Sequence, residues 1–155
     1  MPHDYENWII SFSRSLLFIT TLFVSATLLG QSKTWYFGDN AGVDFSQNPA
    51  MAIDGPIKTN EGCAVVTNAK GRTIFSTDGR TIYNPSGTPV YSGLDGDISS
   101  THSAIIIPHP QSPCERFFVF TVGSAENKSL NAGLHVVEVE ISNGQINVSP
   151  SRKLH

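Results

Sequence analysis

The clearest structural signal in the sequence is the segment Leu134-His-Val-Val-Glu-Val-Glu-Ile-Ser-Asn-Gly-Gln-Ile-Asn-Val148. Within it, residues 137–141 alternate apolar and charged side chains, which is typical of a strand with one buried and one solvated face. The dipeptide Asn143-Gly144 separates this run from the short β-prone run Gln145–Val148. Asn-Gly between two such runs is the strongest short-range hairpin signal, because both residues tolerate the positive φ angles of a type I′ turn. The segment therefore predicts an antiparallel hairpin.

Similar signals recur along the chain after residue 32. Asn68-Ala-Lys-Gly71 and Asp78-Gly79 each lie between two short β-prone runs, and no window shows a sustained 3.6-residue period. Ala104-Ile-Ile-Ile107 and Phe117-Phe-Val-Phe120 are continuous apolar runs, as expected of strands covered on both faces. The predicted strands are Thr34–Phe37, Ala64–Thr67, Thr73–Ser76, Thr81–Tyr83, Ala104–Ile107, Arg116–Val122, Leu134–Ile141 and Gln145–Val148.

The N-terminal region contains the most apolar stretch, Ser15–Leu29, which follows Arg14 and ends at Gly30-Gln31-Ser32. Its length fits the roughly 7–15 residues of a signal-peptide core and is short of the roughly 20 that a membrane-spanning helix needs. We expect residues 1–32 to be a signal peptide that is cleaved near 30–32. The product would be secreted or held at the cell surface, with no stable membrane span after cleavage. An uncleaved anchor and a buried core helix are the alternatives.

The hairpins predict an all-β fold, and their spacing fits either a β-propeller or a small β-sandwich. A four-stranded blade uses roughly 40–50 residues, so residues 33–155 would supply two to three blades. Closed propellers usually have four to eight blades. We therefore expect an incomplete propeller in a region that is truncated at its C-terminus, with a small β-sandwich as the alternative.

The composition excludes several functional classes. A net charge of −3 with only 15% charged residues leaves no basic surface for nucleic acid, and 39% hydrophobic residues argue against wholesale disorder. Neither a phosphate-binding glycine loop nor a Gly-x-Ser-x-Gly nucleophile elbow is present in the sequence. We therefore predict no catalytic site and no cofactor.

Two pairs of residues are weak candidates for a site. Asp95 and Asp97 stand two apart, as in calcium loops, but the other oxygen ligands of a full loop are missing, and a polar hairpin tip is the alternative. Cys63 and Cys114 are the only cysteines. An even pair in an exported chain makes a disulfide a candidate, and a buried free thiol at Cys63 is the rival interpretation.

Three segments carry a family resemblance. They are Trp35-Tyr-Phe-Gly-Asp-Asn-Ala-Gly-Val-Asp-Phe45, Thr59-Asn-Glu-Gly-Cys-Ala64 and Ser99-Ser-Thr-His-Ser-Ala-Ile-Ile-Ile-Pro108. In this order they resemble the WYFGxxAGLDF, NTEGCA and SSTQSAIIVP motifs of large secreted and surface proteins from gliding Bacteroidetes, with His102 in place of the family's Gln. Those proteins carry PKD repeats and a type IX secretion sorting domain, and the motifs belong to their propeller-like N-terminal region.

The resemblance implies a propeller-like fold, and we interpret its motif residues as structural. They would hold hairpins in place, and the alternative is that a few of them line a central channel or an end face. The residues are Trp35, Tyr36, Phe37, Gly38, Gly42, Asp44, Phe45, Glu61, Gly62, Asp78, Gly79 and Asn84.

These observations favour a non-catalytic extracellular module for interaction or adhesion, with a glycan, matrix or protein partner. The first alternative is part of a glycan-active propeller enzyme, a hydrolase or lyase, that would gather two carboxylates around one channel. Its candidates are Asp44, Glu61, Asp78 and Asp95. The second alternative is a fragment of a larger open reading frame with no function of its own.

Overall fold

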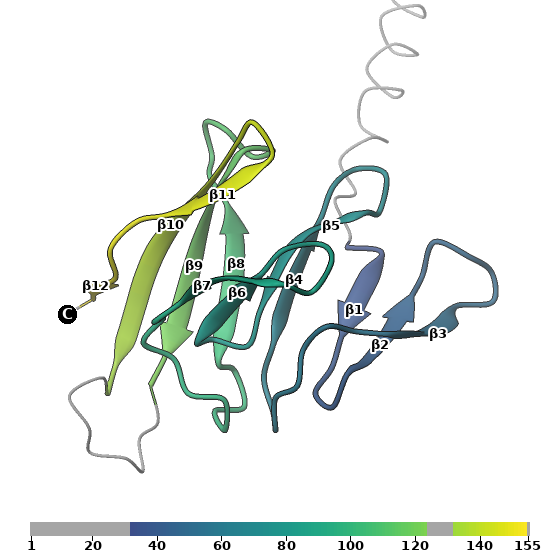
Figure 1. The fold of residues 1–155 in the computed structure, drawn as a ribbon, viewed down its shortest axis with the longest axis horizontal. Helices are drawn as coiled ribbons and strands as arrows, with labels where there is room; N and C mark the ends of the chain where they lie inside the picture. The colour runs from purple at the N-terminus through teal and green to yellow at the C-terminus, as the bar shows by residue number, and fades with distance from the viewer. Residues whose placement is uncertain (1–31, 124–131, 155) are drawn as a thin grey trace, which may run out of the picture. The chain divides into compact units, whose positions relative to one another are not determined.

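A computed structural model of the chain describes residues 32–123 and 132–154. These residues form twelve strands and no helix (Figure 1), so the predicted all-β fold of antiparallel hairpins is confirmed. In this part of the chain no helix is long and apolar enough to cross a membrane. The expected signal peptide falls on residues 1–32, and all of it except Ser32 lies outside the described residues.

Three antiparallel sheets follow one another along the chain (Figure 1). Sheet A has the order β1-β2-β3, sheet B the order β4-β5-β6-β7, and sheet C the order β11-β10-β9-β8, with β12 also paired to β10. None of the three closes on itself. The strands are β1 (Thr34–Tyr36), β2 (Ala41–Asp44), β3 (Met51–Asp54), β4 (Ala64–Thr67), β5 (Thr73–Thr77), β6 (Thr81–Tyr83), β7 (Pro89–Ser92), β8 (Ala104–Pro108), β9 (Arg116–Val122), β10 (Leu134–Ser142), β11 (Gln145–Val148) and β12 (Arg152–Lys153).

Each sheet is built from strands that are consecutive in the sequence. The edge strand β4 contacts both β1 and β8, the first strands of the other two sheets. Sheet B therefore connects sheets A and C.

The predicted hairpin connections are all present. Asn143 and Gly144 have φ angles of 52° and 75° and place Ser142 opposite Gln145, so β10 and β11 pair directly. Residues 68–71 turn between β4 and β5, and the N–H of Gly71 donates to the carbonyl of Asn68 at 2.8 Å. Residues 78–79 lie between β5 and β6 in the same way.

The core lies between sheets B and C. Phe75 of β5 and Phe117 of β9 meet edge to face, with ring centroids 5.4 Å apart. Both rings are fully buried, and the burial of each such side chain contributes roughly 1.5–3 kcal/mol. The buried cluster consists of Phe75, Ile82, Leu94, Ala104, Phe117, Val119, Val137 and Val139.

Sheet A joins sheet B through polar contacts of β1. The hydroxyl of Tyr36 lies 3.2 Å from Oγ1 of Thr73, and the hydroxyl of Thr34 donates to the carbonyl of Gly71 at 3.3 Å. The two residues stand in alternate positions of β1, so they share one face of the strand. That face is turned toward sheet B.

Four short strands were not predicted from the sequence, namely β2, β3, β7 and β12. Three of them contain Asp, Gly or Pro, residues that are depleted in strands, and β12 has only two residues. Their sequences therefore resemble turns. Pairing with a stronger neighbour places them in the sheets, as when β2 aligns Val43 with Trp35 of β1.

The prediction that Ala104–Ile107 and Phe117–Phe120 are covered on both faces is wrong. Alternate residues of both strands face sheet B, but Ile105 and Ile107 are 53% and 46% exposed. A continuous apolar run shows that a strand is hydrophobic on both sides, and it does not show that both sides are covered.

Candidate functional site

Three loop segments with family-like motifs meet beside the start of β8, and we call them the loop cluster. They are residues 59–63, 78–79 and 94–103. The hydroxyl of Thr59 donates to the carbonyl of Ile98 at 3.0 Å, and the N–H of Gly96 donates to the carbonyl of Gly79 at 3.0 Å. The structure thus brings together motif residues that lie far apart in the sequence.

Gly62 lies at the tightest contact of the loop cluster. Its N–H donates to the carbonyl of Ser100 at 3.3 Å, and its own carbonyl accepts the hydroxyl of Ser103 at 2.5 Å. A Cβ atom at this position would lie 2.6 Å from the backbone nitrogen of Ser103 and 2.8 Å from the carbonyl oxygen of Thr101. Because these obstacles are backbone atoms, only glycine fits here. The preceding Glu61 accepts the hydroxyl of Thr101 at 3.1 Å on the surface.

Asp78 organises the turn between β5 and β6. One carboxylate oxygen accepts the N–H groups of Arg80 at 2.8 Å and Thr81 at 2.7 Å, and the other accepts the hydroxyl of Tyr83 at 2.9 Å. The residue is buried, so these three bonds compensate the carboxylate for lost water. Burial raises the pKa of Tyr83 above its usual value, and the bond to Asp78 raises it further.

The motif residues of sheet A lie elsewhere and are more exposed than their apolar character suggested. Trp35, Phe37 and Phe45 are each about half exposed, and the rings of Trp35 and Phe45 meet edge to face at 5.3 Å. Tyr36 is half-buried. Gly38 connects sheet A to the loop cluster, since a Cβ atom there would lie 2.3 Å from the carbonyl oxygen of Thr59.

The remaining motif residues serve local turns. Asp44 accepts the N–H and the hydroxyl of Ser46 at 2.8 and 2.9 Å, and these bonds lower the pKa of Asp44. Asn84 accepts the N–H groups of Ser86 and Thr88 at 3.0 and 2.9 Å. Gly42 of β2 lies against the ring of Tyr36. These contacts agree with the structural interpretation of the motif.

The two calcium candidates contact different neighbours. Asp97 accepts the N–H and the hydroxyl of Ser99, each at 2.9 Å. Asp95 contacts His135 and Ser151 instead. Among the described residues no group of three His, Cys, Asp or Glu side chains could hold a metal ion, and the calcium interpretation stays a prediction.

The candidate disulfide between Cys63 and Cys114 is not formed, and both thiols are free. Cys63 follows Gly62, which touches Ser103 just before β8, whereas Cys114 lies beyond the other end of that strand. A strand of five residues is about 16 Å long at about 3.3 Å per residue, but the Cα atoms of a disulfide lie within about 7 Å. Cys63 donates to the carbonyl of Tyr36 at 3.0 Å. Burial raises the pKa of the Cys63 thiol, and the charge of Asp78 adds to this effect.

A polar contact between the loop after β7 and sheet C was not predicted from the sequence. Nδ1 of the buried His135 lies 2.9 Å from Oδ2 of Asp95, and the hydroxyl of Ser151 donates to the same oxygen. These contacts tie the loop after β7 to β10 and to the residue before β12. The sequence did contain one indication that His135 is buried. It lies on the same face of β10 as Val137 and Val139, because alternate residues of a strand share a face.

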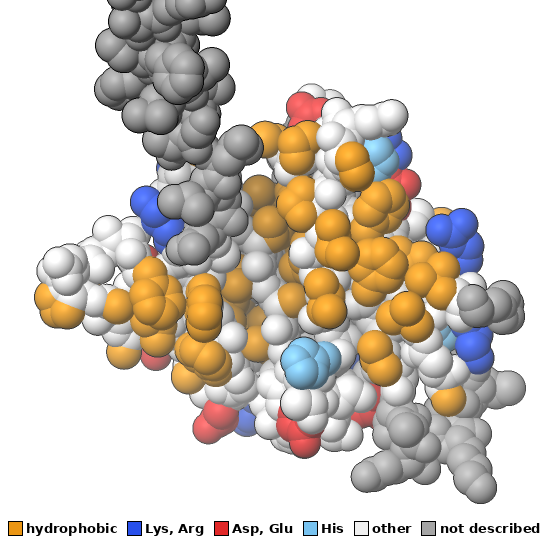
Figure 2. Space-filling model, turned by 180° about the vertical axis from the view of Figure 1, so that it is seen from behind, with side chains coloured by type: hydrophobic (Ala, Val, Ile, Leu, Met, Phe, Trp, Pro, Cys, Tyr) orange, Lys and Arg blue, Asp and Glu red, His pale blue; other side chains and the backbone are white. Residues whose placement is uncertain are grey.

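The face of sheet C that is turned away from sheet B is apolar, and we call it the outer face. The register places Ile105 opposite Phe120 and Ile107 opposite Phe118. Figure 2 shows hydrophobic side chains gathered over the region of sheet C, with a second group over sheet A. The outer face consists of Ile105, Ile107, Phe118, Phe120, Val122, Leu134 and Val136, of which only Val136 is buried.

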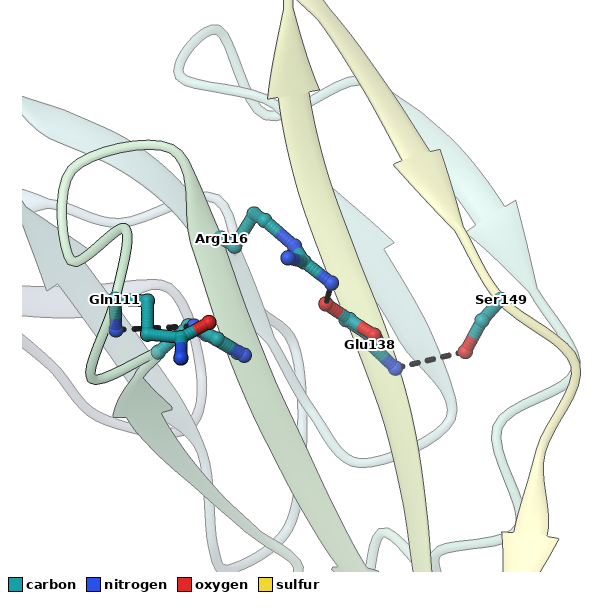
Figure 3. A network of polar contacts seen from close by, with 5 residues as sticks. Gln111, Arg116, Glu138 and Ser149 are labelled. Atoms are coloured by element: carbon teal, nitrogen blue, oxygen red, sulfur yellow. Dashed lines mark hydrogen bonds and ion pairs between the residues drawn. The ribbon is translucent and has the colours of Figure 1, made fainter.

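Polar side chains border the outer face (Figure 3). Arg116 of β9 forms an ion pair with Glu138 of β10, and the N–H of Glu138 donates to the hydroxyl oxygen of Ser149 at 2.8 Å. The N–H of Gln111 donates to Nδ1 of His109 at 3.2 Å, and the His109 ring packs 5.1 Å from Phe118. An apolar centre with a polar rim is typical of a protein-binding surface.

A groove lies where β1, β4 and β8 approach one another. It has a volume of about 350 Å³, within the range of ligand-binding clefts. Trp35 and Tyr36 form the wall from sheet A, and Ile105 is shared with the outer face. The lining residues are Ser32, Trp35, Tyr36, Cys63, Ala64, Val65, Ala104, Ile105 and Ile106, none of which carries a full charge.

Comparisons of the chain with protein-family models, curated proteins and solved structures found no match. The resemblance of the motifs to propeller-like regions of secreted proteins therefore stays a prediction. The geometry described above is the basis for the functional proposals that follow.

Proposed function

We propose that this chain is a non-catalytic interaction module that binds a protein partner through the outer face of sheet C. The observation that carries the proposal is the row of exposed Ile105, Ile107, Val122 and Leu134 around half-buried phenylalanines. Soluble proteins rarely leave a contiguous apolar surface of this kind without a use for it. Phenylalanine is also enriched at protein interfaces.

The carboxylates support a binding function over an enzyme. A glycosidase needs two carboxyl groups that face the substrate. Asp78 is buried, and its carboxylate already accepts three hydrogen bonds. Asp44 is held by Ser46, and Asp95 is held by His135 and Ser151. Glu61 lies at the surface, with one bond to Thr101.

We further propose that the module is exported and that its three sheets are consecutive blades of a β-propeller. The support for export is the apolar segment Ser15–Leu29 with small residues after it. The test is expression of the full chain in a bacterial host, followed by N-terminal sequencing of the exported product. A product that begins at Gln31 or Lys33 supports the proposal, and a product that retains Met1 contradicts cleavage.

The binding function is tested with two matched surface variants. The first, Ile107→Lys with Val122→Lys, places charges on the outer face. The control, Val90→Lys, adds a charge at an equally exposed apolar position of β7 in sheet B. Arrays of extracellular proteins and of glycans are probed with labelled full chain.

We expect the wild type and Val90→Lys to bind the same protein targets and the outer-face variant to lose at least tenfold in affinity. Binding confined to glycans, or binding that the outer-face charges leave unchanged, would refute this assignment. Turnover of a polysaccharide or peptide by the purified chain would favour the enzyme instead.

A further inference from the structure

A cleft is lined by residues from three hairpin turns of sheets B and C, and we call it the amide cleft. Asn68 lies in the turn between β4 and β5, Asn84 in the turn between β6 and β7, and Gly144 in the turn between β10 and β11. The cleft has a volume of about 630 Å³, within the range of ligand-binding clefts. None of its lining residues carries a charge, and none belongs to the outer face.

Two amide side chains of the cleft are fixed by the turns to which they belong. Oδ1 of Asn68 accepts the N–H groups of Lys70 and Arg72 at 2.9 and 3.1 Å, and Oδ1 of Asn84 is occupied in the same way. These bonds identify the oxygen of each amide, so the other end is the NH₂ group. Among the described residues neither NH₂ group has an acceptor. The cleft therefore offers two donors whose side chains are already ordered for a ligand.

The other two amides of the cleft, Gln145 and Asn147, lie on β11. They stand in alternate positions of the strand, so they share one face, and both residues are exposed. Neither side chain forms a hydrogen bond within the described part of the chain. Ile74, Ile141 and Ile146 are half-buried against the core and add aliphatic surface to the lining. The amide cleft thus combines unused donors and acceptors with apolar surface.

A second cleft of about 490 Å³ adjoins the amide cleft. The residues that line both are Asn68, Thr73 and Pro85. The second cleft extends toward sheet A, where the ring of Tyr36 lines it and the opposite charges of Asp44 and Arg72 balance. The carboxylate of Asp44 accepts two hydrogen bonds, which leaves acceptor sites for a ligand. Two adjoining clefts fit an elongated ligand.

We propose that the amide cleft binds a neutral oligosaccharide, with further sugar units in the adjoining cleft. Ring hydroxyl groups accept hydrogen bonds from the NH₂ groups of Asn68 and Asn84 and exchange hydrogen bonds with Gln145 and Asn147. A hydroxyl group both donates and accepts, so it satisfies either end of a side-chain amide. The apolar C–H faces of the sugar rings pack on the aliphatic part of the lining.

Other classes of ligand fit the amide cleft less well. An anion finds no cation among its lining residues, and a lipid chain would remove water from four amides without replacing their hydrogen bonds. A neutral peptide is the remaining alternative. The amides come from two turns and a strand, and rotatable hydroxyl groups meet such separate partners more readily than the fixed alternation of a peptide backbone. The inference goes beyond the proposed protein-binding function, because it assigns a second ligand class to a second surface.

The test titrates neutral hexasaccharides derived from cellulose, starch and mannan into the full chain by calorimetry. A hexamer of galacturonic acid is the charged counterpart, and a capped hexapeptide of alternating threonine and valine is the peptide counterpart. We expect at least one neutral hexasaccharide to bind at millimolar concentration or below, at least tenfold more tightly than either counterpart. No binding of any neutral hexasaccharide at that concentration, or a difference of less than tenfold from either counterpart, would overturn the proposal.

A pair of double variants locates the binding site. Gln145→Ala with Asn147→Ala removes two exposed amides from the cleft, and the control, Asn60→Ala with Gln111→Ala, removes two exposed amides that do not line it. We expect the first variant to lose at least tenfold in affinity for the hexasaccharide and the control to bind it like the wild type. Loss with both variants, or with neither, contradicts binding in the amide cleft.

The two proposals fail in different ways, because protein targets report on the outer face and hexasaccharides report on the amide cleft. If the outer face has no function, the protein signal is insensitive to Ile107→Lys with Val122→Lys, while hexasaccharide binding still depends on Gln145 and Asn147. If the oligosaccharide proposal is wrong, the protein signal keeps its dependence on the outer face and the hexasaccharide data fail as stated above. Circular dichroism of each variant confirms that its strands are intact.

Discussion

Sheet C has one covered face and one open face, although neighbouring residues of the same strands build both. Phe117 of β9 is 1% exposed against Phe75 of sheet B, whereas the next residue, Phe118, is half-buried on the outer face. The aromatic residues Trp35, Phe37 and Phe45 of sheet A are also about half exposed. The difference shows that the hydrophobicity of a side chain does not by itself decide its burial here. A side chain of sheet C is buried where sheet B packs against it.

The largest expected effect separates the two neighbouring phenylalanines. Phe117→Ala should lower the free energy of unfolding by about 3–5 kcal/mol, because it leaves a cavity in a packed core. Phe118→Ala should cost less than half as much, since its ring lies partly in solvent. Urea denaturation followed by circular dichroism measures both. Equal losses would show that the outer face is packed as tightly as the core.

A second pair compares two aspartates that organise turns. Asp78→Ala should cost about 2–3 kcal/mol, because it leaves the N–H groups of Arg80 and Thr81 and the hydroxyl of Tyr83 without their acceptor in a buried position. Asp44→Ala removes bonds to Ser46 at the exposed end of β2, and we expect no measurable change in the denaturation midpoint. A similar loss of stability for both variants would contradict the view that burial makes the hydrogen bonds of Asp78 more important than those of Asp44.

The covered region should also respond to alkaline pH. The pKa of Tyr83 is raised in the folded state, so the native protein favours the neutral phenol. This contribution is fully present below the unfolded pKa of about 10 and is lost as the pH rises through the folded pKa. We expect Tyr83→Phe to flatten the fall in stability above pH 10. An unchanged slope would assign that fall to other groups.

The smallest effect concerns the two thiols. Cys114 is exposed, whereas the half-buried Cys63 has a raised pKa and donates its proton to the carbonyl of Tyr36. Only the thiolate reacts with iodoacetamide, so Cys114 should be labelled at least tenfold faster at pH 8. Mass spectrometry of timed samples gives both rates. Comparable labelling rates would show that the thiol of Cys63 is as reactive and accessible as that of Cys114.

Local signals allowed much of the fold to be predicted from the sequence. The hairpins at Asn143-Gly144 and Asp78-Gly79 depend on backbone conformations that few other residue pairs adopt, so the dipeptides are informative by themselves. The short strands β2 and β3 were missed because Ala41–Asp44 and Met51–Asp54 resemble turns. Their pairing with β1 depends on a register that only the assembled sheet defines.

The candidate sites were harder to predict, because each depends on contacts between sheets. Ala104–Ile107 and Phe117–Phe120 look alike in sequence whether one face or both are covered. The contact of Asp95 with His135 joins residues 40 positions apart that no local pattern connects. Asp78 and Gly62 hold a turn and a loop contact, roles that Asx and Gly residues favour for local reasons, and Glu61 makes one surface bond to Thr101.

The occupied carbonyls of β1 have a consequence for solubility. An exposed strand edge is normally a template for its own copy, because donors and acceptors alternate on both. On β1 the side chains of Ser32 and Cys63 already bond the two carbonyls that face away from β2, and β4 lies against the same strand. The edge is therefore a poor template for self-association.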